Sequence, residues 1–219
     1  NILGTILIGQ KKLNEAEHPL RKTIKLNPDF FPAHLNLGAV LKDLGQLQEA
    51  ELSTRKAIEL NPDSADAHSN LGIILKDLGK LKEAELLTRK AIELNPDFVE
   101  AHFNLGVILN ELKKTKEAFS TFLHVINIQS NNTAFYHYIS DFLSTVDLNI
   151  LDKNDLKKML EIILTLDNIS HDNLFHCFNY LYNLEGIKES NNLLENAEVK
   201  IITNDLLVMN SLEKIIFKS

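Results

Sequence analysis

Apolar positions along much of the chain recur at spacings of three and four residues, which is the period of an amphipathic helix. Between residues 67 and 78 they fall at Leu71, Ile74, Leu75 and Leu78. A second periodic segment runs from Lys80 to Leu94. Gly79 separates the two segments, at a position where a left-handed residue ends a helix, and the proline of Asn95-Pro96-Asp97 cannot extend the second helix. The pattern predicts a helical hairpin, made of a first helix A and a second helix B.

The hairpin recurs at a fixed period along the chain. The segment AHLNLGAVLKDLGQLQEAELSTRKAIELNPD begins at Ala33 and returns with few changes from Ala67; a third, degrading copy begins at Ala101, and a truncated copy starts at Asn1. Two columns keep one residue type in all four copies, namely Gly4, Gly38, Gly72 and Gly106, and Ala16, Ala50, Ala84 and Ala118. Small residues at these columns allow helices A and B to approach closely. One hairpin cannot bury its own apolar stripe, so we expect the copies to stack.

These glycine, alanine and proline columns on a 34-residue period resemble the tetratricopeptide repeat, or TPR. The resemblance implies an all-α fold, a right-handed superhelical solenoid of helix-turn-helix hairpins, over residues 1–132. The expected units are a truncated repeat at 1–30 and repeats at 31–64, 65–98 and 99–132. In the last copy Lys113 replaces the turn glycine and Ser130 the closing proline, which suggests that regular stacking ends there. Pro19 lies inside the first B segment, where a kink or a late helix start is expected.

Residues 133–219 are expected to form a capping helix and an irregular helical extension that leads to a further domain. The predicted helices lie near 133–146, 153–167, 171–183, 186–196 and 203–217. The first carries Phe135, Ile139, Phe142 and Leu143 at helical spacing and is expected to cover the apolar edge of the last hairpin. The last predicted helix has no capping signal at its end, which suggests a longer natural chain.

Composition narrows the possible partners. The formal charge of −7 and the pI near 5.6 disfavour phosphate backbones, and no apolar stretch approaches the roughly 20 residues of a membrane-spanning helix. Cys177 is the single cysteine, so no intrachain disulfide forms, as is usual in a reducing compartment. We therefore expect a cytoplasmic protein with no nucleic-acid and no membrane partner; the pattern leaves the oligomeric state open.

A column of asparagines is the first candidate binding feature. It consists of Asn36, Asn70 and Asn104 on successive A helices, which line the inner surface of TPR proteins. An asparagine amide both donates and accepts, so it can pair with a peptide backbone. The column is similar to the asparagine ladder in the TPR superhelix of O-linked N-acetylglucosamine transferases, which implies a role in holding an extended peptide. The alternative is that these asparagines bond between neighbouring helices.

Charged pairs form further columns that we expect on the same face, with Lys42 beside Asp43 and Lys76 beside Asp77. They could recognise a ligand that carries both charges; the alternative is that each lysine pairs with its own aspartate. Phe103 supplies apolar contact near them. The clamp with which some TPR proteins hold the acidic tail of chaperones is not expected, because Asp66 and Glu100 stand where lysine would help.

Metal binding and catalysis are not expected. His34, His68 and His102 recur once in each repeat and would lie on separate hairpins, so their ligand atoms do not converge, and inter-repeat packing is the better interpretation. His171, His176 and Cys177 are interpreted as core residues. No nucleophile with a base, phosphate-binding glycine loop or pair of carboxylates in an apolar setting is visible, and no cofactor is expected.

The sequence thus predicts a protein-interaction scaffold, not an enzyme, that binds an extended peptide or a helix of another protein in a concave groove. One alternative is the substrate-recruiting region of a larger bacterial transferase, a glycosyltransferase or methyltransferase, whose catalytic domain lies outside this chain. Another is a structural element whose inner surface is covered by its own C-terminal helices or by a second copy.

Overall fold

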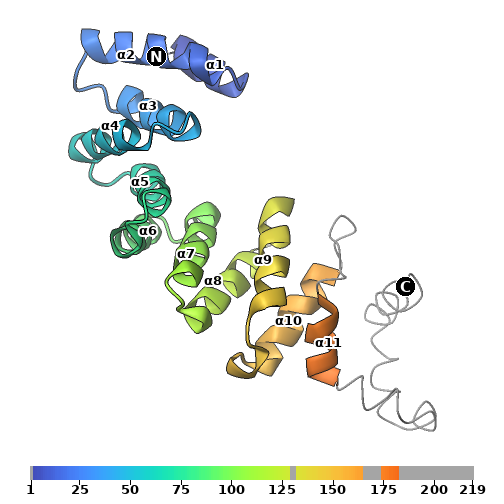
Figure 1. Cartoon of the computed structure of the whole chain (residues 1–219). Coiled ribbons are helices and arrows are strands. Elements are labelled where there is room, and N and C mark those ends of the chain that lie inside the picture. Colours follow the sequence, from blue (N-terminus) through green and yellow to red (C-terminus); the bar gives the residue numbers. More distant parts are fainter. Residues whose placement is uncertain (1, 129–131, 165–173, 183–219) are drawn as a thin grey trace, which may run out of the picture. The chain divides into compact units, whose positions relative to one another are not determined.

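The computed structural model describes residues 2–128, 132–164 and 174–182, and every regular element within these ranges is helical (Figure 1). The chain divides into two compact units, Asn1–Ala118 and Phe119–Ser219. The boundary falls inside one helix, α8 (Thr115–Asn127). The all-α solenoid class predicted from the sequence is confirmed.

The first unit consists of helices that alternate as A and B, with nearly equal lengths in the full copies. They are α1 (Ile2–Gly9), α2 (Leu13–Leu26), α3 (Phe31–Asp43), α4 (Leu47–Leu60), α5 (Ala65–Asp77), α6 (Leu81–Leu94) and α7 (Val99–Glu111), followed by the start of α8. Helices α1, α3 and α5 each pack on the B helix that follows, α2, α4 and α6 each pack on the next A helix, and successive A helices contact one another. This is the stacking of hairpins that the repeat period predicts.

The turn between helices A and B has one geometry in successive copies. Gly45 and Gly79 have φ angles of 76° and 75°, and the residue after each donates its N–H to a carbonyl in the last turn of helix A, such as Lys80 N to Leu75 O at 2.8 Å. Lys113 occupies the same position with φ of 61°, and Lys114 N reaches Leu109 O at 2.9 Å. The missing glycine therefore leaves the turn intact, with a lysine in the left-handed conformation.

A Lys113→Gly substitution should stabilise the protein by about 1 kcal/mol, because a residue with a Cβ pays roughly 1–2 kcal/mol to adopt the left-handed conformation. Urea unfolding of wild type and variant checks this. Gly79→Lys is the matched control, in the repeat where the glycine is present, and should lose a similar amount. An unchanged unfolding midpoint in both variants would contradict the account of the turn.

The glycine column marks where helices A and B touch, and the contact on helix B is a threonine. A Cβ added to Gly38 would stand 2.1 Å from Thr54 Oγ1, and one added to Gly72 would stand 2.3 Å from Thr88 Oγ1. Both threonines are fully buried, and each hydroxyl donates to a carbonyl of its own helix, that of Ala50 or Ala84. Glycine is required here by the close approach of the two helices.

The core of the first unit runs between hairpins. One buried cluster joins α2, α3, α4 and α5 through Ala16, Leu20, Leu37, Val40, Leu41, Ala50 and Ile74. A second joins α5, α6 and α7 through Leu71, Leu75, Ala84 and Ile108. Pro19 lies within α2, which begins at Leu13, so the late start considered for this helix does not occur. Burial between copies thus supplies the apolar contacts that one hairpin lacks.

The second unit is built on α9 (Thr133–Thr145), the short 3-10 helix η1 (Leu148–Ile150), α10 (Lys153–Leu164) and α11 (Phe175–Tyr182). The ring of Phe122, from the part of α8 in this unit, lies 5.7 Å from Tyr138 and 5.1 Å from Phe142 of α9. The predicted capping helix therefore packs on the last B helix. The helices expected near 186–196 and 203–217, and the ends of those near 153–167 and 171–183, lie outside the described residues.

Candidate functional site

The three asparagines predicted to form a ladder lie on α3, α5 and α7, and all are partly buried. Asn36 Nδ2 donates to Thr5 Oγ1 at 3.4 Å, and Asn104 Nδ2 donates to Ser69 Oγ at 3.5 Å. Both bonds are long, and each joins neighbouring A helices. Asn70 makes no side-chain hydrogen bond to a described residue. Within the described part of the chain, Asn70 is the one of the three with both the donor and the acceptor of its amide unused, whereas Asn36 and Asn104 each use their Nδ2 donor.

The charged pairs on the same helices bond within themselves. Lys42 Nζ lies 2.9 Å from Asp43 Oδ1, and Lys76 Nζ lies 2.8 Å from Asp77 Oδ1. Lys76 also lies 3.9 Å from Glu111 on α7, so it bridges two A helices. These pairs are partly exposed, and such pairs contribute little to stability. They leave a face that carries both signs of charge, with Phe103 half-buried on α7.

Each histidine of the column forms a hydrogen bond to a proline carbonyl, which the sequence did not predict; the sequence predicted inter-repeat packing. His34 Nε2 lies 2.7 Å from the carbonyl oxygen of Pro28, and the same bond joins His68 to Pro62 at 2.8 Å and His102 to Pro96 at 2.7 Å. Because a carbonyl only accepts, Nε2 carries the proton. Each histidine thus ties the start of helix A to the loop before it. The constant spacing between proline and histidine is the sequence signal for this bond.

A network of ion pairs, which sequence analysis missed, joins successive B helices. Arg55 bonds Glu51 in its own helix at 2.8 Å and Glu83 in the next B helix at 2.6 Å. Lys80 also reaches Glu51, at 2.8 Å. The following repeat copies the arrangement with Arg89, Glu85, Glu117 and Lys114. The signal was present in the sequence as arginine and glutamate columns that recur together from one repeat to the next.

Acid should weaken this network. The hydrogen bond from Lys80 lowers the pKa of Glu51, and the pKa of Glu85 is also lowered, because the bonds from Lys114 and Arg89 outweigh the opposing effect of its burial. A lowered folded-state pKa means that the carboxylate stabilises the fold above the unfolded-state pKa of about 4.3, and that this contribution is lost as the pH falls through the folded-state value. Unfolding free energies at neutral pH and in acid should therefore differ less in Glu51→Gln than in wild type, and an equal acid loss would contradict the network.

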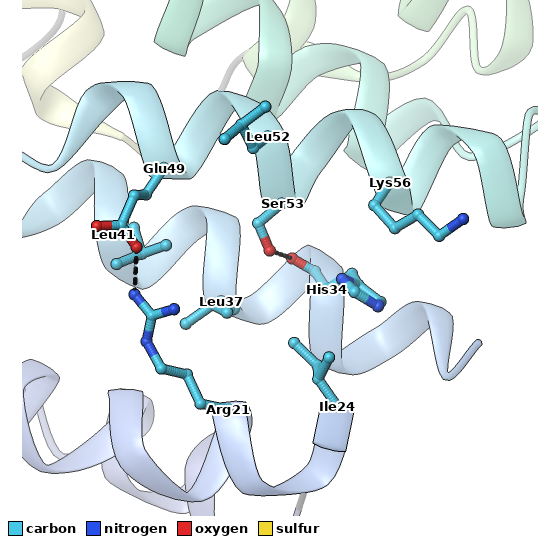
Figure 2. Close-up of a pocket in the computed structure, with 9 residues that line it drawn as sticks. All are labelled: Arg21, Ile24, His34, Leu37, Leu41, Glu49, Leu52, Ser53 and Lys56. Atoms are coloured by element: carbon cyan, nitrogen blue, oxygen red, sulfur yellow. Dashed lines mark hydrogen bonds and ion pairs between the residues drawn. The ribbon is translucent and has the colours of Figure 1, made fainter. Parts of the chain in front are cut away.

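A pocket of about 300 Å³ opens between α2 and α4, with α3 at its base (Figure 2). Its apolar wall is made by Ile24, Leu37, Leu41 and Leu52, and its polar lining by Arg21, His34, Glu49, Ser53 and Lys56. Arg21 is bonded to Glu49 across one end, and Ser53 Oγ donates to the carbonyl of His34 at 3.1 Å. None of these residues belongs to the predicted binding columns.

Cys177 lies in the second unit and has no exposed surface, and its burial raises the pKa of the thiol to about 12. This burial confirms that Cys177 is a core residue. His176, next to it, is half-buried, and its Nε2 lies 2.8 Å from the carbonyl oxygen of Leu143. Over the described ranges, no three metal-ligating side chains come together, and no helix has the length and apolar character needed to cross a membrane.

Comparison with family models identifies the repeats. Models described as tetratricopeptide repeat match residues 65–98, and also residues 20–51 and 87–119; a model described as TPR repeat matches residues 40–79. A comparison with curated protein sequences gives no match.

Three solved structures with the same fold share 22%, 22% and 24% of their residues with this chain. The crystal structure of MamA has a TM-score of 0.62 at 22% identity and covers 74% of this chain and 92% of that chain. YrrB, described as a TPR protein with an unusual peptide-binding site, has a TM-score of 0.59 at 22% identity and covers 80% and 87%. A mutant O-GlcNAc transferase of Thermobaculum terrenum has a TM-score of 0.54 at 24% identity and covers 57% and 24%.

Proposed function

This chain is a tetratricopeptide-repeat protein, and from that premise we propose that it is a protein-interaction scaffold that binds an extended peptide on the face formed by α3, α5 and α7. The observation that carries the proposal is the repeated set of polar side chains on these helices. One asparagine and one lysine–aspartate pair recur in the copies at 31–64 and 65–98. YrrB, which shares the fold, is described as having a peptide-binding site.

The spacing of the asparagines fits an extended ligand. Neighbouring helices pack about 8–10 Å apart, and an extended chain advances about 3.3 Å per residue, so one asparagine meets roughly every third residue of a peptide. Asn70 is available without breaking any bond to a described residue. Asn36 and Asn104 would exchange long bonds to Thr5 and Ser69 for bonds to the ligand backbone. The charged pairs would add selectivity, since exposed pairs exchange partners at little cost.

The test is binding to a peptide array by wild type and by the triple variant of Asn36, Asn70 and Asn104 to alanine. We expect binding to fall at least tenfold, and Asn70→Ala alone to account for much of the loss without lowering stability. Circular dichroism confirms that each variant stays helical. The matched control is Asn61→Ala, which changes an exposed asparagine at the end of α4. Undiminished binding by the folded triple variant would refute the proposal.

The domain division expected from the sequence, with the repeats at 1–132 and an extension at 133–219, belongs to this proposal. In it the binding face lies within the repeats, and the extension begins at α9, which packs on Phe122 of α8. We further propose that the scaffold binds without turnover.

A further inference from the structure

The pocket between α2 and α4 exists because of one residue. In the next repeat along the chain, eight of the nine lining positions keep the same residue type, and the exception is Ser53, whose counterpart is Leu87. The side chain of Leu87 is partly buried and packs against the cluster that contains Leu71 and Leu75, as does Ile58. Leu71, Leu75 and Ile58 are the counterparts of three residues that line the pocket, Leu37, Leu41 and Ile24. In the second interface, a leucine side chain therefore occupies the space that the first interface leaves open.

The side chain of Leu87 thus indicates which kind of group fits the pocket beside Ser53. The space beside Ser53 is bounded by Leu37 and Leu41, the counterparts of two leucines in the cluster against which Leu87 packs, so a leucine-sized aliphatic group has a complementary surface there. Filling it would remove apolar surface of Leu37, Leu41 and Ile24 from water, which is favourable in proportion to the area covered. Leu52 at the mouth is 70% exposed and offers further apolar contact to whatever enters.

One lining cation, Lys56, can meet an acidic group of a ligand. The lining residues carry two cations, Arg21 and Lys56, and one carboxylate, Glu49. Arg21 is held by Glu17 and Glu49, whereas the partner of Lys56 among the described residues is the exposed Glu59, at 3.0 Å. An exposed pair of this kind is worth little, so Lys56 can turn to a ligand carboxylate.

We propose that this pocket is a second binding site, for an acidic peptide segment that inserts one leucine-sized aliphatic side chain between α2 and α4. The site uses the B helices and is separate from the asparagine columns on the A helices. It does not rest on the function proposed above. Its specificity comes from Ser53, which keeps the cavity open, and from Lys56, which selects the charge beside the inserted side chain.

The experiment titrates the full chain with the capped peptide Glu-Glu-Leu-Glu-Glu, following the backbone amide signals of pocket residues by NMR. Glu-Glu-Ser-Glu-Glu and Lys-Lys-Leu-Lys-Lys are the matched peptides. We expect shifts at Leu41 and Ser53 with the first peptide, and binding at least tenfold weaker for each of the other two. If the serine peptide binds as tightly as the first peptide, the leucine side chain is not the anchor. If the lysine peptide binds as tightly, the site does not select an acidic ligand.

Substitutions at Ser53 and at its counterpart Leu87 test the site within one protein, because each converts one residue into the other. Ser53→Leu, which copies the next repeat, should weaken binding at least tenfold while the protein stays folded. Leu87→Ser should open the equivalent cavity and add a second site, seen as new shifts at Leu75. Lys56→Glu should weaken binding about two- to fivefold, and Lys90→Glu, which changes the corresponding lysine beside the filled cavity, should leave it unchanged. Wild-type affinity in Ser53→Leu would refute the site.

Discussion

Replacing Ile74 by alanine is expected to lower the free energy of unfolding by about 2 to 5 kcal/mol. Ile74 has no exposed surface, and it lies in the cluster that joins α5 to α3 and α4. Truncating it removes apolar contact and leaves a cavity between two hairpins, because the surrounding helices relax only in part. In a solenoid each repeat contacts only its neighbours, so loss at one interface is not shared by the others. Chemical denaturation followed by circular dichroism measures the loss.

The same column supplies the control. Ile6 precedes Ile74 by two repeats, in α1, and is 51% exposed, whereas Val40, between them, is 1% exposed. Ile6→Ala should therefore cost less than about 0.5 kcal/mol, as substitutions of exposed residues usually do. A similar loss in Ile6→Ala and Ile74→Ala would contradict the account, because it would mean that burial between repeats is not what stabilises the fold.

Gly72→Ala is expected to destabilise the protein by about 1 to 3 kcal/mol, the usual cost of inserting a methyl group into a full core. On an exposed helix this change would be favourable by about 1 kcal/mol, since alanine is the better helix former. The added Cβ, however, would stand 2.3 Å from Thr88 Oγ1 and 3.4 Å from the carbonyl of Ala84. Thr88 is fully buried and cannot swing into solvent, so the two helices must separate. Thermal or urea unfolding gives the magnitude.

A second substitution should restore the stability that Gly72→Ala removes. Thr88→Ala deletes the atom that meets the new Cβ, so the double variant with Gly72→Ala should regain most of the lost stability, and a double-mutant cycle measures the coupling. Gly9→Ala is the control for helix propensity, because nothing lies within 4 Å of its added Cβ. Additive effects of Gly72→Ala and Thr88→Ala would show that this contact does not set the distance between helices.

The repeat period made the fold predictable, but it did not predict which side chains the recurring residues contact. A hairpin in every repeat, a glycine turn and small residues where helices meet all follow from local rules, and the structure confirms them at Gly79 and Gly72. That Gly72 meets Thr88 depends on how the two helices are rotated about their axes. Sequence spacing within one helix carries no such information.

The candidate sites were predictable only in part. The asparagine column could be placed on one face of the A helices, since equivalent residues of a regular array share a face. Bonding between neighbouring helices was an alternative from the sequence, but the partners of Asn36 and Asn104 could not be predicted, because Thr5 and Ser69 stand at different offsets from them. The pocket was visible in principle as the difference between Ser53 and Leu87. A serine on a helix does not by itself predict a cavity, because the space beside it depends on how the neighbouring helices pack.

The claim that the A helices form the binding face is tested most directly by photo-cross-linking with peptides that the array selects. A photoreactive side chain is placed at Asp77 on α5 in one protein and at Leu86 on α6 in another; both positions are exposed. The account predicts cross-links from position 77, lost when Asn70 is changed to alanine, and none from position 86. Cross-links from position 86 alone would contradict it and would move the peptide site to the B helices.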